Sequence, residues 1–137
     1  MAIIGFNFTS INAEKEGIAK GSIKISNEVT IKNVEEINLS LGKAKEKALK
    51  FMFEFISKYE PAIGKISIKG EILDIEDPKK TKEILKEWKK SKKVPKEVMT
   101  VLLNNILTKC NIKALVLSQD MNLPPPIPLP SVRVKNK

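Results

Sequence analysis

The stretch that decides the fold is residues 94–130, VPKEVMTVLLNNILTKCNIKALVLSQDMNLPPPIPLP. In its first part, apolar or small side chains recur in steps of four and three, which follows one face of a helix that turns about 100° per residue. The members of this stripe are Met99, Leu103, Ile106, Cys110, Ala114, Leu117 and Met121. Further apolar side chains widen the arc to about half of the circumference, more than one sheet face covers. These flanking residues are Val98, Leu102, Ile112 and Val116.

Five prolines follow this predicted long helix, between Leu123 and Pro130. Proline lacks an N–H donor and holds φ near −65°, so the helix must end and the chain must continue in an extended form. Aromatic grooves of other proteins can read such proline spacings. The interspersed Leu123, Ile127 and Leu129 would be costly to leave in water. We therefore predict a strap that packs on its own fold.

Two stretches near the start of the chain alternate between apolar and polar residues, which is the period of a β-strand. The first contains Ile4, Phe6 and Phe8, and the second has apolar residues at odd positions between residues 23 and 31. We expect the second strand to continue through residues 37–41 after a kink or bulge within 33–36.

Residues 49–56 alternate strictly and predict a third strand, although the preceding residues 42–47 are rich in helix formers and could start a helix. A turn near Pro61 and Gly64 leads to a fourth alternating stretch, residues 66–72. Two strands joined by so few residues form an antiparallel hairpin.

A short helix is predicted to begin at Asp77-Pro78, where a capping side chain precedes a proline in the first helical position. Its narrow apolar side consists of Ile84, Leu85 and Trp88. Pro95 ends or kinks this helix and opens the long one. Asn111 is the residue at which the long helix could break.

The formal charge of +9 is concentrated in residues 78–96, where nine lysines and two glutamates give +7. Such a segment could follow a phosphate backbone while Trp88 stacks on a base. The candidate residues for an anionic partner are Lys89, Lys90, Lys92 and Lys93. Two observations favour an ordinary solvated helix face: Trp88 shares a side with Ile84, and arginine, the better ligand for phosphate, occurs only at Arg133.

Composition excludes several kinds of chemistry. Cys110 is the only cysteine and the chain has no histidine, so an intrachain disulfide, the usual zinc sites and a serine–histidine triad are all ruled out. The acidic residues 71–77 could attract magnesium, but alternation sends Glu71 and Asp74 to opposite faces and a solvated strand end explains the group. We expect no catalytic, cofactor or metal site, and a third reading, an enzyme using Glu71 or Asp74, is the weakest.

No segment reaches the roughly 18 uninterrupted apolar residues that span a bilayer, and the first residues lack a charged leader and a cleavage site. We therefore expect a cytoplasmic protein without membrane insertion.

Three segments resemble the SecB family of export chaperones and the small uncharacterised archaeal proteins near that fold. LKFMFEFISKYEPAIGKISIKGEI (residues 49–72) resembles the family's aromatic strand, turn and isoleucine-rich strand. VPKEVMTVLLNNIL (94–107) is similar to its proline-led helix, and NLPPPIPLP (122–130) to the segment after that helix. Members of the family are typically acidic, whereas residues 79–96 are basic here.

The resemblance implies an α+β fold in which an antiparallel four-stranded sheet carries a short and a long helix on one face. We expect a single SecB-like domain over residues 1–130 and a frayed basic tail over 131–137. The resemblance also implies dimers or tetramers and apolar grooves that hold unfolded polypeptide. By spacing, the candidate groove residues are Phe53, Phe55, Trp88, Val101 and Leu115.

Two functions from different classes follow. The leading hypothesis is a non-enzymatic, holdase-type chaperone that binds non-native polypeptide. The alternative is a nucleic-acid-binding protein that uses the lysine-rich helix 79–96.

Overall fold

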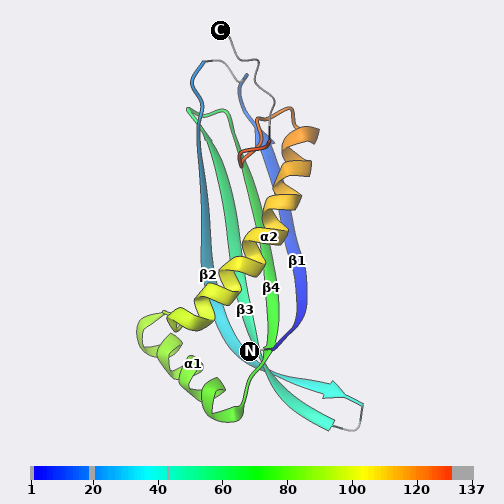
Figure 1. Ribbon diagram of the computed structural model, residues 1–137, viewed down its shortest axis with the longest axis vertical. Helices are drawn as coiled ribbons and strands as arrows, with labels where there is room; N and C mark the ends of the chain where they lie inside the picture. Colours follow the sequence, from blue (N-terminus) through cyan, green and yellow to red (C-terminus); the bar gives the residue numbers. More distant parts are fainter. Residues whose placement is uncertain (1, 19–20, 43, 131–137) are drawn as a thin grey trace.

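The computed structural model describes residues 2–18, 21–42 and 44–130 of the 137-residue chain. Its elements are β1 (Ala2–Lys15), β2 (Lys24–Leu41), β3 (Ala44–Glu60), β4 (Gly64–Ile75), α1 (Pro78–Ser91) and α2 (Lys96–Asp120). The strands form one antiparallel sheet in the order β1-β4-β3-β2, and both helices lie on the same side of it (Figure 1). The predicted α+β fold class is confirmed.

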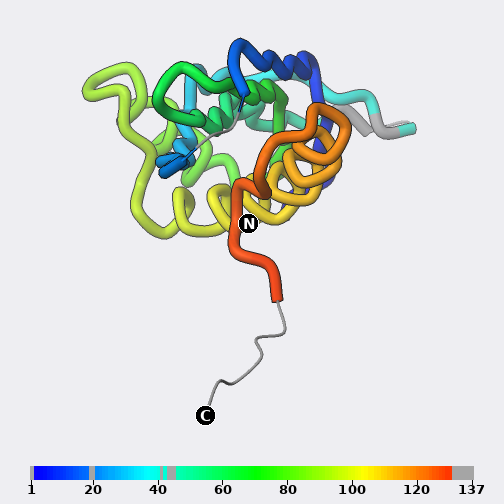
Figure 2. The backbone as a smooth tube through the Cα atoms, turned by 90° about the horizontal axis from the view of Figure 1, so that it is seen from above, coloured from blue at the N-terminus to red at the C-terminus, as the bar shows by residue number. Residues whose placement is uncertain are grey.

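The two faces of the sheet differ in chemistry because apolar and polar residues alternate along each strand. On the helix side, Phe51, Phe53 and Phe55 of β3 are buried together with three isoleucines of β4, at positions 66, 68 and 72. On the other side, ion pairs cross the strands. They are Lys32–Glu54 at 3.4 Å, Lys50–Glu71 at 3.3 Å, Lys50–Glu35 at 3.5 Å and Lys69–Glu54 at 3.8 Å. The single core therefore lies between the sheet and the helices, and Figure 2 shows these layers from above.

An irregularity in β2 changes which residues face the core. Ile31 lies opposite Phe53, but the register then shifts, and Val34 lies opposite Phe51. The predicted bulge is therefore present slightly earlier than residues 33–36, and it brings Val34, at an even position, to the core side. The expected continuation to Leu41 is confirmed. Residues 44–47 are not helical, because they pair with the end of β2.

Helix α2 crosses the sheet obliquely. Its buried residues are spaced by four throughout: Val98, Leu102, Ile106, Cys110, Ala114 and Ser118. A row of residues with this spacing is inclined by about 26° to the helix axis, so packing along it turns the helix across the strands, as Figure 1 shows. The predicted stripe is wrong at its ends, where Met99, Leu117 and Met121 lie beside the buried row and are only partly buried. The helix is continuous through Asn111.

The helix boundaries have clear local causes. The Asp77 carboxylate accepts a hydrogen bond from the Lys80 backbone amide at 2.8 Å, and Pro78 occupies the first turn, as predicted for the start of α1. Lys92 ends α1 in the left-handed region at φ 57°. Pro95 immediately precedes α2.

After α2, the proline-rich residues turn back over the end of the sheet. Leu123 is buried, and its backbone amide donates to the Ser118 carbonyl at 2.8 Å. The Tyr59 hydroxyl donates to the Pro124 carbonyl at 2.7 Å, and the Asn27 amide donates to the Pro126 carbonyl at 2.8 Å. Residues 131–137, predicted to be a frayed tail, lie outside the described residues.

Candidate functional site

The described residues leave one part of the helix side of the sheet uncovered. Helix α2 crosses the sheet diagonally, and α1 contacts β2. The segment after α2 forms hydrogen bonds with Asn27, near the start of β2, and with Tyr59, near the end of β3. The first half of β1 lies beside the C-terminal half of α2 without a covering element (Figure 1).

A groove of about 630 Å³ occupies this position. Its lining residues are Phe6, Asn7 and Phe8 of β1 and Lys109, Ile112, Lys113 and Val116 of α2; we call it the β1–α2 groove. Ile112 is 61 % exposed and Val116 is 48 % exposed, so two aliphatic side chains one helical turn apart are open to water on the same side of α2. The groove is thus a shallow apolar surface that lies open to water.

The floor of the groove is held in place by aromatic packing. The ring of Phe6 meets that of Phe8 edge-on at 5.2 Å between centroids, and it lies 5.3 Å from the buried ring of Phe53. The Lys109 ammonium lies 5.1 Å from the Phe6 centroid, a cation–π distance. The floor is therefore anchored in the core, and a positive charge lies directly above it.

The groove is bordered by the free edge of the sheet, because β1 is an outer strand. Register irregularities occur between Ile3 and Gly5 and between Phe8 and Ser10. Between them, Gly5–Phe8 is a short regular run beside the groove. Bulges of this kind limit edge-to-edge pairing of strands.

Three of the five predicted polypeptide-binding residues are core residues. Phe53 is 2 % exposed, Phe55 is fully buried, and Trp88 is 6 % exposed. The expectation that they line an open groove is corrected, because β3 is a central strand beneath the helices and Trp88 faces inward from α1. Val101 is exposed and Leu115 is partly exposed, but neither lines the β1–α2 groove.

The sequence alone does not predict the β1–α2 groove, because alternation identifies Phe6 and Phe8 only as one face of a strand. Alternation does not reveal that this strand lies at an edge of the sheet. The available signal was Ile112 and Val116, which lie off the predicted helical stripe and needed a partner.

The predicted lysine candidates lie on the exposed side of α1 and just after it. Lys89 and Lys90 border a shallow hollow together with Lys82, Leu85 and Lys86. Lys92 and Lys93 are exposed, and the Lys92 ammonium lies 5.5 Å from the Trp88 ring centroid. Because Trp88 is buried, its ring is not available to stack on a base, so the predicted combination of lysines with an exposed aromatic is absent.

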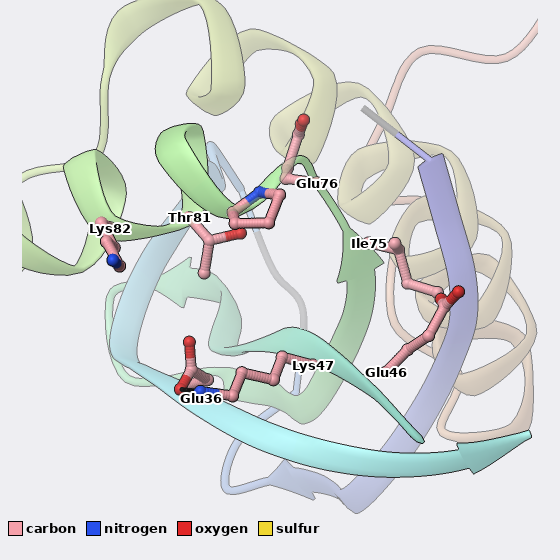
Figure 3. Close-up of a pocket in the computed structure, with 8 residues that line it drawn as sticks. Glu36, Glu46, Lys47, Ile75, Glu76, Thr81 and Lys82 are labelled. Atoms are coloured by element: carbon pink, nitrogen blue, oxygen red, sulfur yellow. Dashed lines mark ion pairs between the residues drawn. The ribbon is translucent and has the colours of Figure 1, made fainter. Parts of the chain in front are cut away.

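A second hollow, of about 400 Å³, lies between the β2–β3 ribbon and the start of α1 (Figure 3). Charges of both signs line it, including Glu36, Glu46, Lys47 and Lys82. Lys47 and Glu36 form an ion pair at 3.6 Å. Within residues 2–18, 21–42 and 44–130, no group of three or more acidic, cysteine or histidine side chains is arranged to hold a metal ion.

Asp74 corrects the expectation that the acidic residues 71–77 form a solvated strand end. Its side chain is fully buried on the helix side of β4, between β1 and β3. The Ala2 backbone amide faces the carboxyl group, but no hydrogen bond of good geometry reaches either oxygen within the described chain. Burial, reinforced by the charge of Glu76, raises the pKa of Asp74 to about 6, while the Ala2 backbone amide and, less strongly, Lys80 oppose the shift.

Two further side chains, Glu71 and Cys110, were candidates for catalysis, and neither is activated for it. Glu71 lies on the opposite face of the sheet from Asp74, as alternation predicted, and is neutralised by Lys50. Burial raises the pKa of the Cys110 thiol to about 12, so the thiolate is not available as a nucleophile near neutral pH.

Comparisons of the chain with models of known families, with curated proteins and with solved structures found no match. Of the helices that the structure describes, neither is both long and apolar enough to cross a membrane.

Proposed function

We propose that this is a non-enzymatic binding protein that holds unfolded polypeptide in the β1–α2 groove, in the manner of the SecB-like chaperones that its sequence resembles. The observation that supports this proposal is the exposure of Ile112 and Val116 above a floor of Phe6 and Phe8. Burial of apolar surface is non-directional, so such a groove accepts many sequences. Its shallow shape suits an extended chain better than a small molecule, which proteins usually bind in deep clefts.

The groove variant Ile112→Asn/Val116→Asn tests this proposal. Both side chains are exposed, so the fold should survive, but each replacement removes about 1 kcal/mol or more of apolar contact with a bound chain. We expect affinity for a chemically denatured, aggregation-prone protein to fall at least tenfold. The measurement is suppression of its aggregation by light scattering, with circular dichroism melting curves to confirm the fold.

The matched control is Val101→Asn/Leu107→Asn, which makes the same kind of change on the same helix outside the groove. Val101 is 39 % exposed and Leu107 is 36 % exposed. This control should protect the client as well as wild type does. Equal loss in both variants, or no loss in either, would count against the groove.

The nucleic-acid alternative is decided by a fluorescent oligonucleotide titrated in parallel. Contacts between lysines and phosphates release counterions, so affinity should fall by orders of magnitude between about 50 and 200 mM salt if six or more phosphates are neutralised. We expect only weak binding at low salt, abolished by charge reversal at Lys89, Lys90, Lys92 and Lys93. Tight binding at physiological salt without capture of denatured protein would favour the alternative.

We also propose that the chain self-associates. Both β1 and β2 are outer strands of the described sheet, and the unpaired backbone groups of an outer strand can pair with a strand of another chain. The edge of β2 is the better site for a second copy, because Lys24–Ile31 is regular whereas two irregularities interrupt β1. Sedimentation at micromolar concentration should give a dimer or tetramer of the 15.4 kDa chain, unchanged in the groove variant. A clean monomer would refute this.

A further inference from the structure

The charges of the β1–α2 groove are of one sign. Of the residues that the structure describes, Lys109 and Lys113 line it, and no aspartate or glutamate does. On the open face of the sheet, by contrast, Lys50 is neutralised by two glutamates. Among the described residues, no ion pair joins Lys109 or Lys113 to a carboxylate of this chain. An apolar segment that covers the groove removes water from these ammonium groups, so a bound segment with carboxylates is favoured over one without.

The strand edge beside the groove restricts the conformation of what binds. A segment that adds to β1 places alternate side chains on the same face as Phe6 and Phe8. Because irregularities flank Gly5–Phe8, a regular ladder extends over only about four residues. Two apolar side chains on this face fit the run, and the next side chains on the same face, one at each end, lie on the side of the sheet that carries the two lysines.

We infer that the groove selects short, extended segments in which apolar residues alternate and acidic residues flank them, and that it binds them as a fifth strand along Gly5–Phe8. This inference rests on the proposed function and adds to it the class of segment and the geometry of binding.

Three fluorescein-labelled peptides test the charge preference. They share a valine and a phenylalanine at alternate positions, and the next residue on the same face at each end is glutamate, glutamine or lysine. Fluorescence anisotropy should give affinities in the order glutamate, glutamine, lysine, with about a tenfold difference between the first and last at low salt. The difference should shrink at 0.5 M salt because surface charges are then screened. An order that salt does not change would overturn the charge argument.

The variant Lys109→Gln/Lys113→Gln should abolish the difference between the glutamate and lysine peptides, while the glutamine peptide keeps its affinity within about twofold because its apolar contacts are intact. The matched control Lys86→Gln/Lys90→Gln removes the same net charge from α1 and should retain the preference. A preference lost equally in both variants would reflect overall charge and overturn the local site.

Backbone methylation tests strand addition. Strand pairing uses every second backbone amide of the added segment. N-methylation of one alternating set of amides in the glutamine peptide should therefore weaken binding at least tenfold, and methylation of the other set should change it little. Equal effects of both sets would overturn the fifth-strand geometry.

The outcomes separate this inference from the proposed function. Capture of denatured protein in the groove, with peptide affinities that ignore Lys109 and Lys113, would overturn the inference and leave the holdase proposal standing. Failure of every peptide and of the denatured protein to bind would overturn both. If the groove variant converts an oligomer into a monomer, a second copy of the chain is the occupant and the inference is wrong.

Discussion

Replacing Asp74 with asparagine should raise the free energy of unfolding at pH 8 by up to about 3 kcal/mol, the free-energy equivalent of a carboxyl pKa that burial raises from 3.8 to about 6. The carboxylate is fully buried and lacks a well-formed hydrogen bond within the described chain, so its charged form is poorly solvated in the folded state. Asparagine has nearly the same shape and carries no charge. The side chain therefore keeps its packing and the unfavourable charge is removed.

The direction of the pH dependence follows from the two protonation states. The pKa of Asp74 is about 6 when folded, against 3.8 for an unperturbed aspartate. Between these values the folded protein holds a proton that the unfolded chain has lost, so the contribution of Asp74 to stability is full below about pH 4 and is lost as the pH rises through 6. The variant should match wild type at pH 4 and exceed it most at pH 7 to 8.

Urea unfolding at several pH values, followed by the fluorescence of the buried Trp88, measures this difference directly. Asp77→Asn is the matched control, because Asp77 is an exposed N-cap and asparagine caps a helix about as well. Its stability should differ from wild type by less than about 0.5 kcal/mol, as for most surface substitutions. An Asp74 variant that is less stable than wild type at pH 8 would show that the carboxylate has a favourable partner.

Much of the fold could be predicted because alternation and capping are local. The alternating phenylalanines at 51, 53 and 55 and the Asp77-Pro78 helix start are encoded within a few residues of each other. The tilt of α2 could not be predicted, because it depends on which row of side chains meets the sheet. That tilt moves the buried row to Val98 and Ser118 and leaves one part of the sheet open.

The candidate site was the least predictable part. Alternation shows that Phe6 and Phe53 each have a buried side, but only the strand order makes one an edge residue and the other a central one. Asp74 was misread for a similar reason: a carboxylate near the end of a strand is solvated unless neighbouring strands extend past it, as β1 and β3 do here. Strand order and relative strand length arise from long-range pairing, which local sequence patterns do not encode.

Deleting residues 123–137 should lower the free energy of unfolding by roughly 3–5 kcal/mol, because it removes a buried leucine and several hydrogen bonds together. Leu123 packs against the core, with side-chain carbons about 3.3 Å from the position that a Cβ on Gly64 would take. The deletion also leaves the buried Tyr59 and the Asn27 side chain without their carbonyl partners. Such a loss is a large share of the stability of a domain of this size, so the protein should melt well below wild type.

Two smaller changes separate the contributions. Leu123→Ala alone should cost about 2–3 kcal/mol through the cavity that it leaves, and Tyr59→Phe about 1 kcal/mol through the lost hydrogen bond. Deleting only residues 131–137 is the matched control, and the sequence predicts that it leaves the melting temperature unchanged. If the longer deletion also melts at the wild-type temperature, the prolines contribute nothing to the fold and their spacing is better explained by recognition in the aromatic groove of another protein.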